Sequence, residues 1–165
     1  MEIHEYRNRV SGITTEKDVA KITLLKIPDK PGITAKIFEP ISEANISVDV
    51  IVKNTSVDNK TDLTFTVKQS DLNAAINIID KVVKEFEGSN IISEKNLAKI
   101  SIIGTGMQDS PGYATKMFKS LAKNNINIDM ITTSEIRITC IIQESYLELA
   151  AQSLHSEFKL DNDIS

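Results

Sequence analysis

Runs of consecutive or alternating hydrophobic residues are separated along the chain by segments in which hydrophobic residues recur every three or four positions. Residues 20–27 form a strand-like run, and residues 28–32 then include two prolines and a glycine, which predict a turn. Hydrophobic side chains follow at helical spacing through residues 33–44. Asn45 suits a left-handed stop after such a helix. The pattern therefore predicts a strand, a turn and an amphipathic helix.

The next forty-odd residues predict two strands, a second helix and a closing strand. The strands cover residues 46–52 and 61–67, with a hairpin loop at 56–60 between them. The helix is expected to have Ser70 or Asp71 as its cap and a hydrophobic stripe formed by Leu72, Ala75, Ile76, Ile79, Val82, Val83 and Phe86. Residues 90–93 close the unit as a strand. The order β-α-β-β-α-β is that of the ferredoxin-like arrangement.

The same pattern recurs eighty positions later. When residues 31–52 are aligned with 111–132, eight of the 22 pairs are identical, and most others exchange one hydrophobic residue for another. The second copy predicts strands at 99–103, 127–132 and 136–142, a helix ending at Lys123 and a last helix at 146–158. The repeat indicates two similar small domains, which bury a modest fraction of their surface and so favour pairing with a partner.

The second copy lacks a convincing closing strand, because residues 159–165 are too polar. Residues 9–15 are strand-like and lie outside the first unit, so we expect them to complete the second sheet and protect its edge. The predicted fold class is α+β, with two ferredoxin-like βαββαβ units in tandem, the second completed by the N-terminal strand. The predicted domains are 16–95 and 96–160, with 9–15 added to the second.

The composition argues against several classes of partner. The net charge is −4 without a run of basic residues, which excludes nucleic acid as the main partner. A ferredoxin-like RNA-binding module would also need exposed aromatic residues on its central strands, where Phe65 is the one candidate. The sequence has no long apolar span and no signal peptide, so we expect no membrane partner and a cytoplasmic location. Cys140 lies in an apolar run and is predicted to be a buried core thiol.

The usual catalytic and cofactor signatures are missing. Gly104 and Gly106 lack the third glycine of a dinucleotide-binding turn. Neither His4 nor His155 has a second ligand at metal-binding spacing. An acylphosphatase-type hydrolase would need an arginine in the first loop, which the sequence does not provide. We therefore predict no catalytic residues, no metal and no cofactor.

The loop before the first helix of each repeat is the best candidate for a site. Residues 29–32 and 109–112 each place an aspartate two positions before a Pro-Gly pair at a helix start. Free N–H groups and the helix dipole favour a carboxylate there. An aspartate, or a carbonyl of the strand beginning at Asn45 or Asn125, can accept an ammonium. The two parts together suit a free amino acid, although a plain turn with an aspartate that caps the helix explains the same residues.

These residues also resemble a known family, the C-terminal regulatory region of aspartate kinases, which is a tandem pair of ACT domains. The resemblance covers about residues 9–160 and rests on the runs 21–25, 28–32, 44–49, 61–66, 99–107, 110–112 and 125–137. Its most specific part is Thr132-Thr-Ser-Glu-Ile-Arg137 after the second Pro-Gly motif. The resemblance implies a sensor of threonine and lysine that inhibits a separate kinase domain.

The resemblance also implies an effector site between an ACT domain of one chain and its counterpart in another. One half would be Asp29, Gly32, Ile33, Thr34 and Lys53, and the facing half Asn125, Ile126, Asn127 and Ile128. Positions that match lysine-sensitive relatives are Met107, Ser110, Gly112, Tyr113, Asp129, Ser134 and Glu135. Thr34 and Lys53 replace the family's more frequent Ala and Gln, which we expect to influence effector preference.

The resemblance implies a regulatory chain without a kinase domain of its own, either a natural small subunit or an excised piece. Its expected partners are a second copy, paired through ACT domains, or the catalytic chain of aspartate kinase, with threonine and/or lysine as the allosteric ligands. A structural dimer that has lost effector binding is the alternative.

Overall fold

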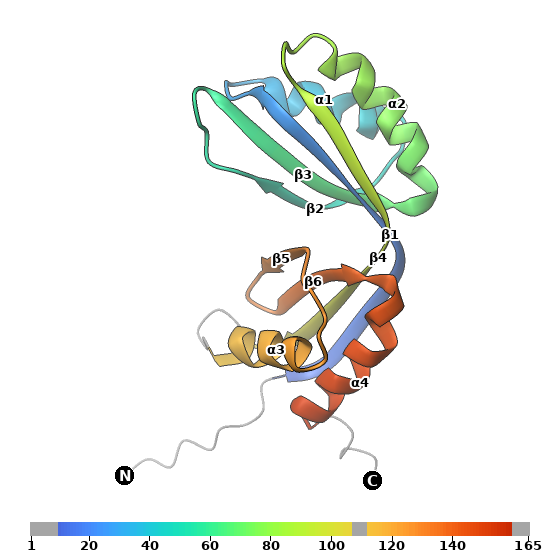
Figure 1. Ribbon diagram of the computed structural model, residues 1–165, viewed down its shortest axis with the longest axis vertical. Coiled ribbons are helices and arrows are strands. Elements are labelled where there is room, and N and C mark those ends of the chain that lie inside the picture. The colour runs from blue at the N-terminus through green and yellow to red at the C-terminus, as the bar shows by residue number, and fades with distance from the viewer. Residues whose placement is uncertain (1–9, 107–111, 160–165) are drawn as a thin grey trace. The chain divides into compact units, whose positions relative to one another are not determined.

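The computed structural model describes residues 10–106 and 112–159, which divide into two compact units (Figure 1). The first unit comprises residues 18–96. The described part of the second comprises residues 10–17, 97–106 and 112–159. In each unit two helices pack side by side on an antiparallel sheet.

The first unit follows the predicted order of elements. It contains most of strand β1 (Val10–Pro28), then α1 (Ile33–Glu43), β2 (Val48–Lys53), β3 (Lys60–Lys68), the short 3-10 helix η1 (Gln69–Asp71), α2 (Leu72–Val83) and the start of β4 (Asn90–Gly104). Its strands are arranged β2-β3-β1-β4. This is the ferredoxin-like order, in which the helices connect strands that are not neighbours.

The second unit repeats this arrangement with one strand taken from the N-terminal side. It contains the rest of β4, then α3 (Gly112–Lys123), β5 (Met130–Thr133), β6 (Arg137–Gln143), η2 (Glu144–Tyr146) and α4 (Leu147–Glu157). Its strands are arranged β1-β4-β6-β5, and Ser11 Oγ donates a hydrogen bond to Ile103 O at 3.3 Å. The predicted fold class, including completion of the second sheet by the N-terminal strand, is confirmed.

Two strands are longer than the sequence pattern predicted. The expected strands at 9–15 and 20–27 form one continuous β1, and those at 90–93 and 99–103 form one continuous β4. The chain passes between the units at Asp18 and at Asn96, which have φ angles of 57° and 61°. Asp and Asn tolerate this left-handed conformation better than most residues, so each strand changes unit without ending.

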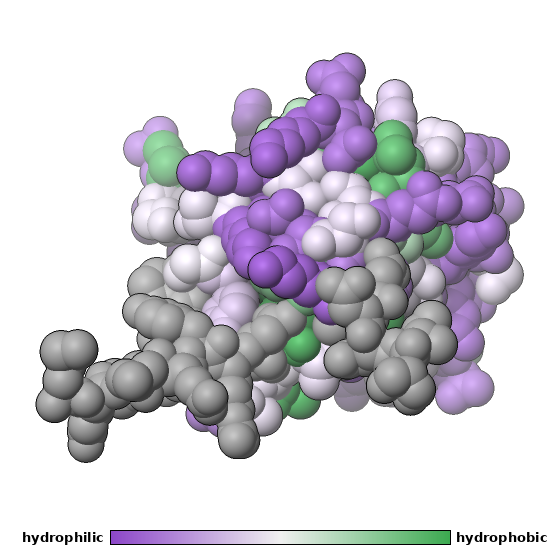
Figure 2. Space-filling model, turned by 90° about the horizontal axis from the view of Figure 1, so that it is seen from below, coloured by the Kyte–Doolittle hydropathy of each residue, from purple (hydrophilic) through white to green (hydrophobic). Residues whose placement is uncertain are grey.

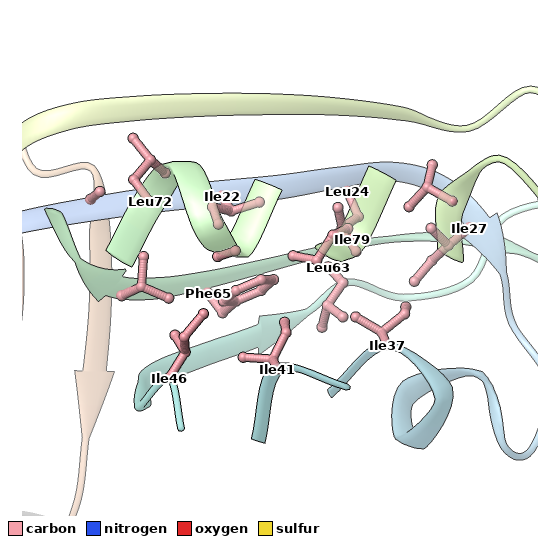
Figure 3. Close-up of a cluster of buried hydrophobic side chains, with 14 of the residues drawn as sticks. Ile22, Leu24, Ile27, Ile37, Ile41, Ile46, Leu63, Phe65, Leu72 and Ile79 are labelled. Carbon is pink, nitrogen blue, oxygen red and sulfur yellow. The ribbon is translucent and has the colours of Figure 1, made fainter. Parts of the chain in front are cut away.

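The core of the first unit is built mainly from isoleucine and leucine, with Phe65 at its centre and Phe86 also buried. Phe65 on β3 has no exposed surface and meets the ring of Phe38 edge-on, with ring centroids 5.0 Å apart. Figure 3 shows Ile41 and Ile46 on one side of the Phe65 ring and Leu63 beside it. The helical stripe that the sequence predicted for α2 faces this core, since Leu72, Ala75, Ile79 and Val83 are buried.

In the core of the second unit, Cys140 occupies the position that corresponds to Phe65 in the first unit. Cys140 pairs with Ile100 across β6 and β4, as Phe65 pairs with Ile22 across β3 and β1. Cys140 is fully buried, and burial raises the pKa of its thiol to about 12. The predicted core thiol is therefore confirmed.

The predicted caps of the second helix are wrong. Asp71 occupies the N-cap position of α2, but its side chain makes no capping hydrogen bond. The chain instead turns into α2 through η1, whose backbone already follows a tighter helical path. The preceding side chain, Gln69, bonds to Asn96: its Oε1 accepts the Asn96 N–H at 2.8 Å.

The surface seen in Figure 2 is mostly hydrophilic, and hydrophobic residues appear on it as small separate patches. Among the helices that the structure describes, none is long and apolar enough to cross a membrane. The described residues also contain no group of three or more His, Cys, Asp or Glu side chains that could hold a metal ion.

Candidate functional site

The loop between β1 and α1 carries the first group of predicted site residues. Gly32 is the N-cap of α1 and has a φ of 92°, which favours glycine over residues with a side chain. Ile33 begins the helix and is buried in the first core. The Asp29 N–H donates to Asn59 O at 2.9 Å, so the β2–β3 hairpin holds the loop in place.

Asp29 forms an ion pair with Lys53, the last residue of β2. The Lys53 Nζ lies 2.6 Å from Asp29 Oδ1, and the two side chains are 45% and 25% exposed. This hydrogen bond lowers the pKa of the Asp29 carboxyl below its ordinary value, and a weaker contribution from Ser56 acts in the same direction. The interpretation of Asp29 as a simple helix cap is wrong, because α1 has no side-chain capping hydrogen bond.

Two residues that support this site escaped the sequence reasoning. Ser56 interacts with the Asp29 side chain, and Asn59 accepts its backbone N–H. Both belong to the predicted hairpin loop, in which Asp58 and Asn59 have φ angles of 52° and 60° and form a tight turn. An Asp-Asn pair is a recognisable signal for that turn, but its distance from the β1–α1 loop cannot be inferred from the sequence.

The start of α1 is accessible to an anion. A Cβ added to Gly32 would have nothing within 4 Å, and Thr34 is exposed. The first turn contains no acidic residue, and no side chain caps its N–H groups. The positive end of the helix dipole is therefore open near the Asp29 carboxylate.

The second group of predicted residues lies in the turn between α3 and β5 of the second unit. Asn125 has a φ of 56°, which matches the 59° of Asn45 at the same point of the first unit. Ile126 is buried, whereas Asn127 is exposed and Ile128 half-buried. The Asn127 side-chain amide donates to Asp129 Oδ1 at 3.4 Å. This turn offers backbone and amide groups beside an acidic side chain.

The remaining predicted residues are divided between described and undescribed parts of the chain. Gly112 and Tyr113 begin α3, and the Tyr113 ring lies 6.4 Å from that of Phe158. Ser134 and Glu135 are exposed in the β5–β6 turn, where the Ser134 N–H donates to Arg137 O at 2.8 Å. Met107 and Ser110 lie outside the described residues.

The structure thus brings Asp29, Gly32 and Lys53 together at one corner of the first unit. Ile33 and Thr34 follow directly at the start of α1, and the remaining predicted residues belong to the second unit.

Two hollows in the surface of the first unit are lined by residues outside the predicted site. One, of about 510 Å³, lies between α2 and β4, and the other, of about 520 Å³, lies against the β2–β3 hairpin.

Comparison with known proteins connects this architecture to one family. The ACT domain family model matches residues 25–83 and 100–158. The aspartate kinase Ask_LysC of Stutzerimonas stutzeri is 48% identical over 152 residues, which is 92% of this chain and 37% of that protein. The Helicobacter pylori aspartokinase is 41% identical over 152 residues, which is again 92% of this chain and 37% of that protein. The chain therefore spans well under half the length of these curated relatives.

Solved structures match nearly end to end. The ligand-free regulatory subunit of aspartate kinase from Thermus thermophilus is 37% identical with a TM-score of 0.84, and the match covers 91% of this chain and 99% of that one. A chain in the crystal structure of aspartokinase alpha and beta subunits matches over the same shares with a TM-score of 0.81. This chain belongs to the ACT-domain family, in which it corresponds to the regulatory region of aspartate kinases.

Proposed function

We propose that this chain senses amino-acid end products, binding threonine and/or lysine between ACT domains of two subunits, and that it relays feedback inhibition to aspartate phosphorylation. The observation that carries the proposal is the corner formed by Asp29, Gly32 and Lys53, beside an uncapped helix start. This corner offers an acceptor for an ammonium and donors for a carboxylate within one loop. Those are the two charged groups of every free amino acid.

The site is proposed to be completed by another subunit. Asn125 to Ile128 would approach the Asp29 corner from a facing ACT domain, and Ile33 and Thr34 would contribute from the start of α1. Gly112, Tyr113, Asp129, Ser134 and Glu135 would form the equivalent pocket of the second unit, with Met107 and Ser110. We also propose that residues 16–95 form the first ACT domain and that residues 96–160, with the strand 9–15, form the second.

Two relatives support particular ligands and partners. Aspartokinase III of E. coli, which shares the fold at 21% identity and a TM-score of 0.72, was solved with lysine and aspartate. The structure of alpha and beta subunits joins two kinds of aspartokinase chain. We propose a second copy of this chain or a catalytic chain as the partner, and the cytoplasm as the compartment.

Titration calorimetry on the purified chain tests the proposal. Threonine, lysine or both together should release heat and should raise dimer affinity in sedimentation, because a ligand that bridges two subunits favours their association. Asp29→Ala should weaken binding roughly tenfold or more, since it removes a charge-assisted hydrogen bond. Asp71→Ala is the matched control. The Asp71 carboxylate makes no capping bond to α2, and it follows the end of β3 opposite to the one that lies beside the Asp29 loop.

The alternative is an ACT-domain dimer that no longer binds effectors. A correctly folded dimer that gives no heat with either amino acid would favour this alternative. An unchanged affinity in Asp29→Ala would move the site to other residues while leaving effector binding intact.

A further inference from the structure

The ion pair between Asp29 and Lys53 has a consequence for which amino acids the first unit can accept. Lys53 is fixed at the end of β2, where β2 pairs with β3, so its Cα cannot withdraw from the site. Its ammonium lies 2.6 Å from the carboxylate that an effector's ammonium would need. A bound amino acid must therefore share Asp29 with Lys53 or displace the Lys53 ammonium by a short distance.

The charges then favour one class of ligand. Asp29 and Lys53 carry one negative and one positive charge, and the amino-acid head group adds one of each. The bound corner is balanced if the ligand's side chain is neutral. A cationic side chain adds an excess positive charge close to Lys53 and to the positive end of α1, where like charges repel.

We propose that Lys53 is a specificity-determining residue, which makes the first-unit site select amino acids with neutral side chains and reject those with cationic ones. This inference rests on the proposed function of the same site. The ligand ammonium competes with Lys53 for Asp29, and the attraction between the Lys53 ammonium and the ligand carboxylate offsets part of that cost.

The repeat within the chain supports a difference between its two units. Extending the alignment of 31–52 with 111–132 by one position places Thr133 opposite Lys53. Thr133 is the last residue of β5, as Lys53 is the last residue of β2, and its side chain is neutral. The source of the selectivity is therefore present in the first unit and lacking at the matching strand end of the second.

Two of the neighbouring lysines, Lys36 and Lys60, are engaged elsewhere, whereas Lys30 is exposed in the same loop as Asp29. The Lys36 ammonium is bonded to Glu85 and lies 5.8 Å from the centre of the Phe86 ring. The Lys60 ammonium reaches Glu87 O at 3.4 Å. Among the described lysines, Lys53 is the one that forms an ion pair with the Asp29 carboxylate.

The test compares threonine and lysine as probes of the full chain, with the backbone amide signal of Gly32 in an NMR titration as the reporter of this site. In the unchanged protein, threonine should saturate the Gly32 shift at lower concentration than lysine. In Lys53→Gln the preference should change in favour of lysine by about fivefold, the size expected for a partly exposed charge. Lys53→Arg should retain the original preference, and added salt should reduce it.

Lys68→Gln is the matched control, because Lys68 is exposed at the opposite end of β3 and pairs with Val19 rather than with the β1–α1 loop. This substitution should leave the ratio of the threonine affinity to the lysine affinity unchanged. If threonine moves the Gly32 signal but Lys53→Gln leaves the ratio within twofold, the selectivity proposal is overturned and the site survives. A wild-type preference for lysine overturns it too. If neither amino acid moves the signal in any variant, the proposed function fails as well.

Discussion

Replacing Phe65 by alanine should remove a large part of the stability of the first unit. The side chain has no exposed surface, and its ring packs edge-on against Phe38 at 5.0 Å and 71°. Truncation of a buried phenylalanine costs about 3–5 kcal/mol, to which the lost aromatic pair contributes about 0.5–1.5 kcal/mol. Small domains have a total unfolding free energy of about 5–15 kcal/mol, so the loss is large on that scale.

Urea denaturation followed by circular dichroism measures this loss. The unfolding transition of the first unit should move to lower urea with little change in slope, because the surface exposed on unfolding is nearly the same. Val57→Ala is the control: Val57 is 70% exposed in the hairpin, so its change should stay within about 0.5 kcal/mol. A cost below about 1 kcal/mol for Phe65→Ala would refute the assignment of Phe65 to the centre of a close-packed core.

Three further predictions concern single residues. The lowered pKa of Asp29 means that its ion pair stabilises the protein above the ordinary carboxyl pKa of about 4, and that this contribution disappears as the pH falls through the lower folded value. Melting curves of Asp29→Asn and the unchanged protein should therefore differ at pH 7 and converge in acid, and a gap that persists in acid would contradict the ion pair. Cys140, with its thiol pKa raised to about 12 by burial, should react with a thiol reagent at pH 8 only after denaturant is added. Asn45→Ala should cost about 1 kcal/mol in chemical denaturation because Asn45 has a φ of 59°, whereas Asn45→Gly should not be destabilising; equal losses in both would point to a role for the amide side chain.

The fold could be predicted from the sequence because two independent signals agreed. Hydrophobic periodicity separated strands from helices, and the repeat fixed the number of units and their common order. The role of residues 9–15 followed from counting strands in the second copy. The joining of these residues to 20–27 could not be predicted, since it depends on Asp18 accepting a left-handed conformation in mid-strand.

The candidate site was predictable only in part, for a physical reason. The Pro-Gly turn and the start of α1 are local features, and a local pattern is enough to find them. The partnership of Asp29 with Lys53 is a contact across the sheet corner, between residues far apart in the chain. Its geometry depends on the register of β2, β3 and β1, in which Lys53 faces Leu63 and Pro28 faces Lys60.

The shared strand β1 also determines how the protein can be synthesised and divided. Residues 10–17 leave the ribosome before any of the first unit, yet their partners in β4 and the rest of the second unit come after it. The first unit can fold once residue 96 has been synthesised, whereas the second unit also needs the residues that follow, so the second unit is completed later. A fragment starting at Leu97 would lack an edge strand, and a separate peptide with the sequence of residues 10–17 is the natural way to supply it.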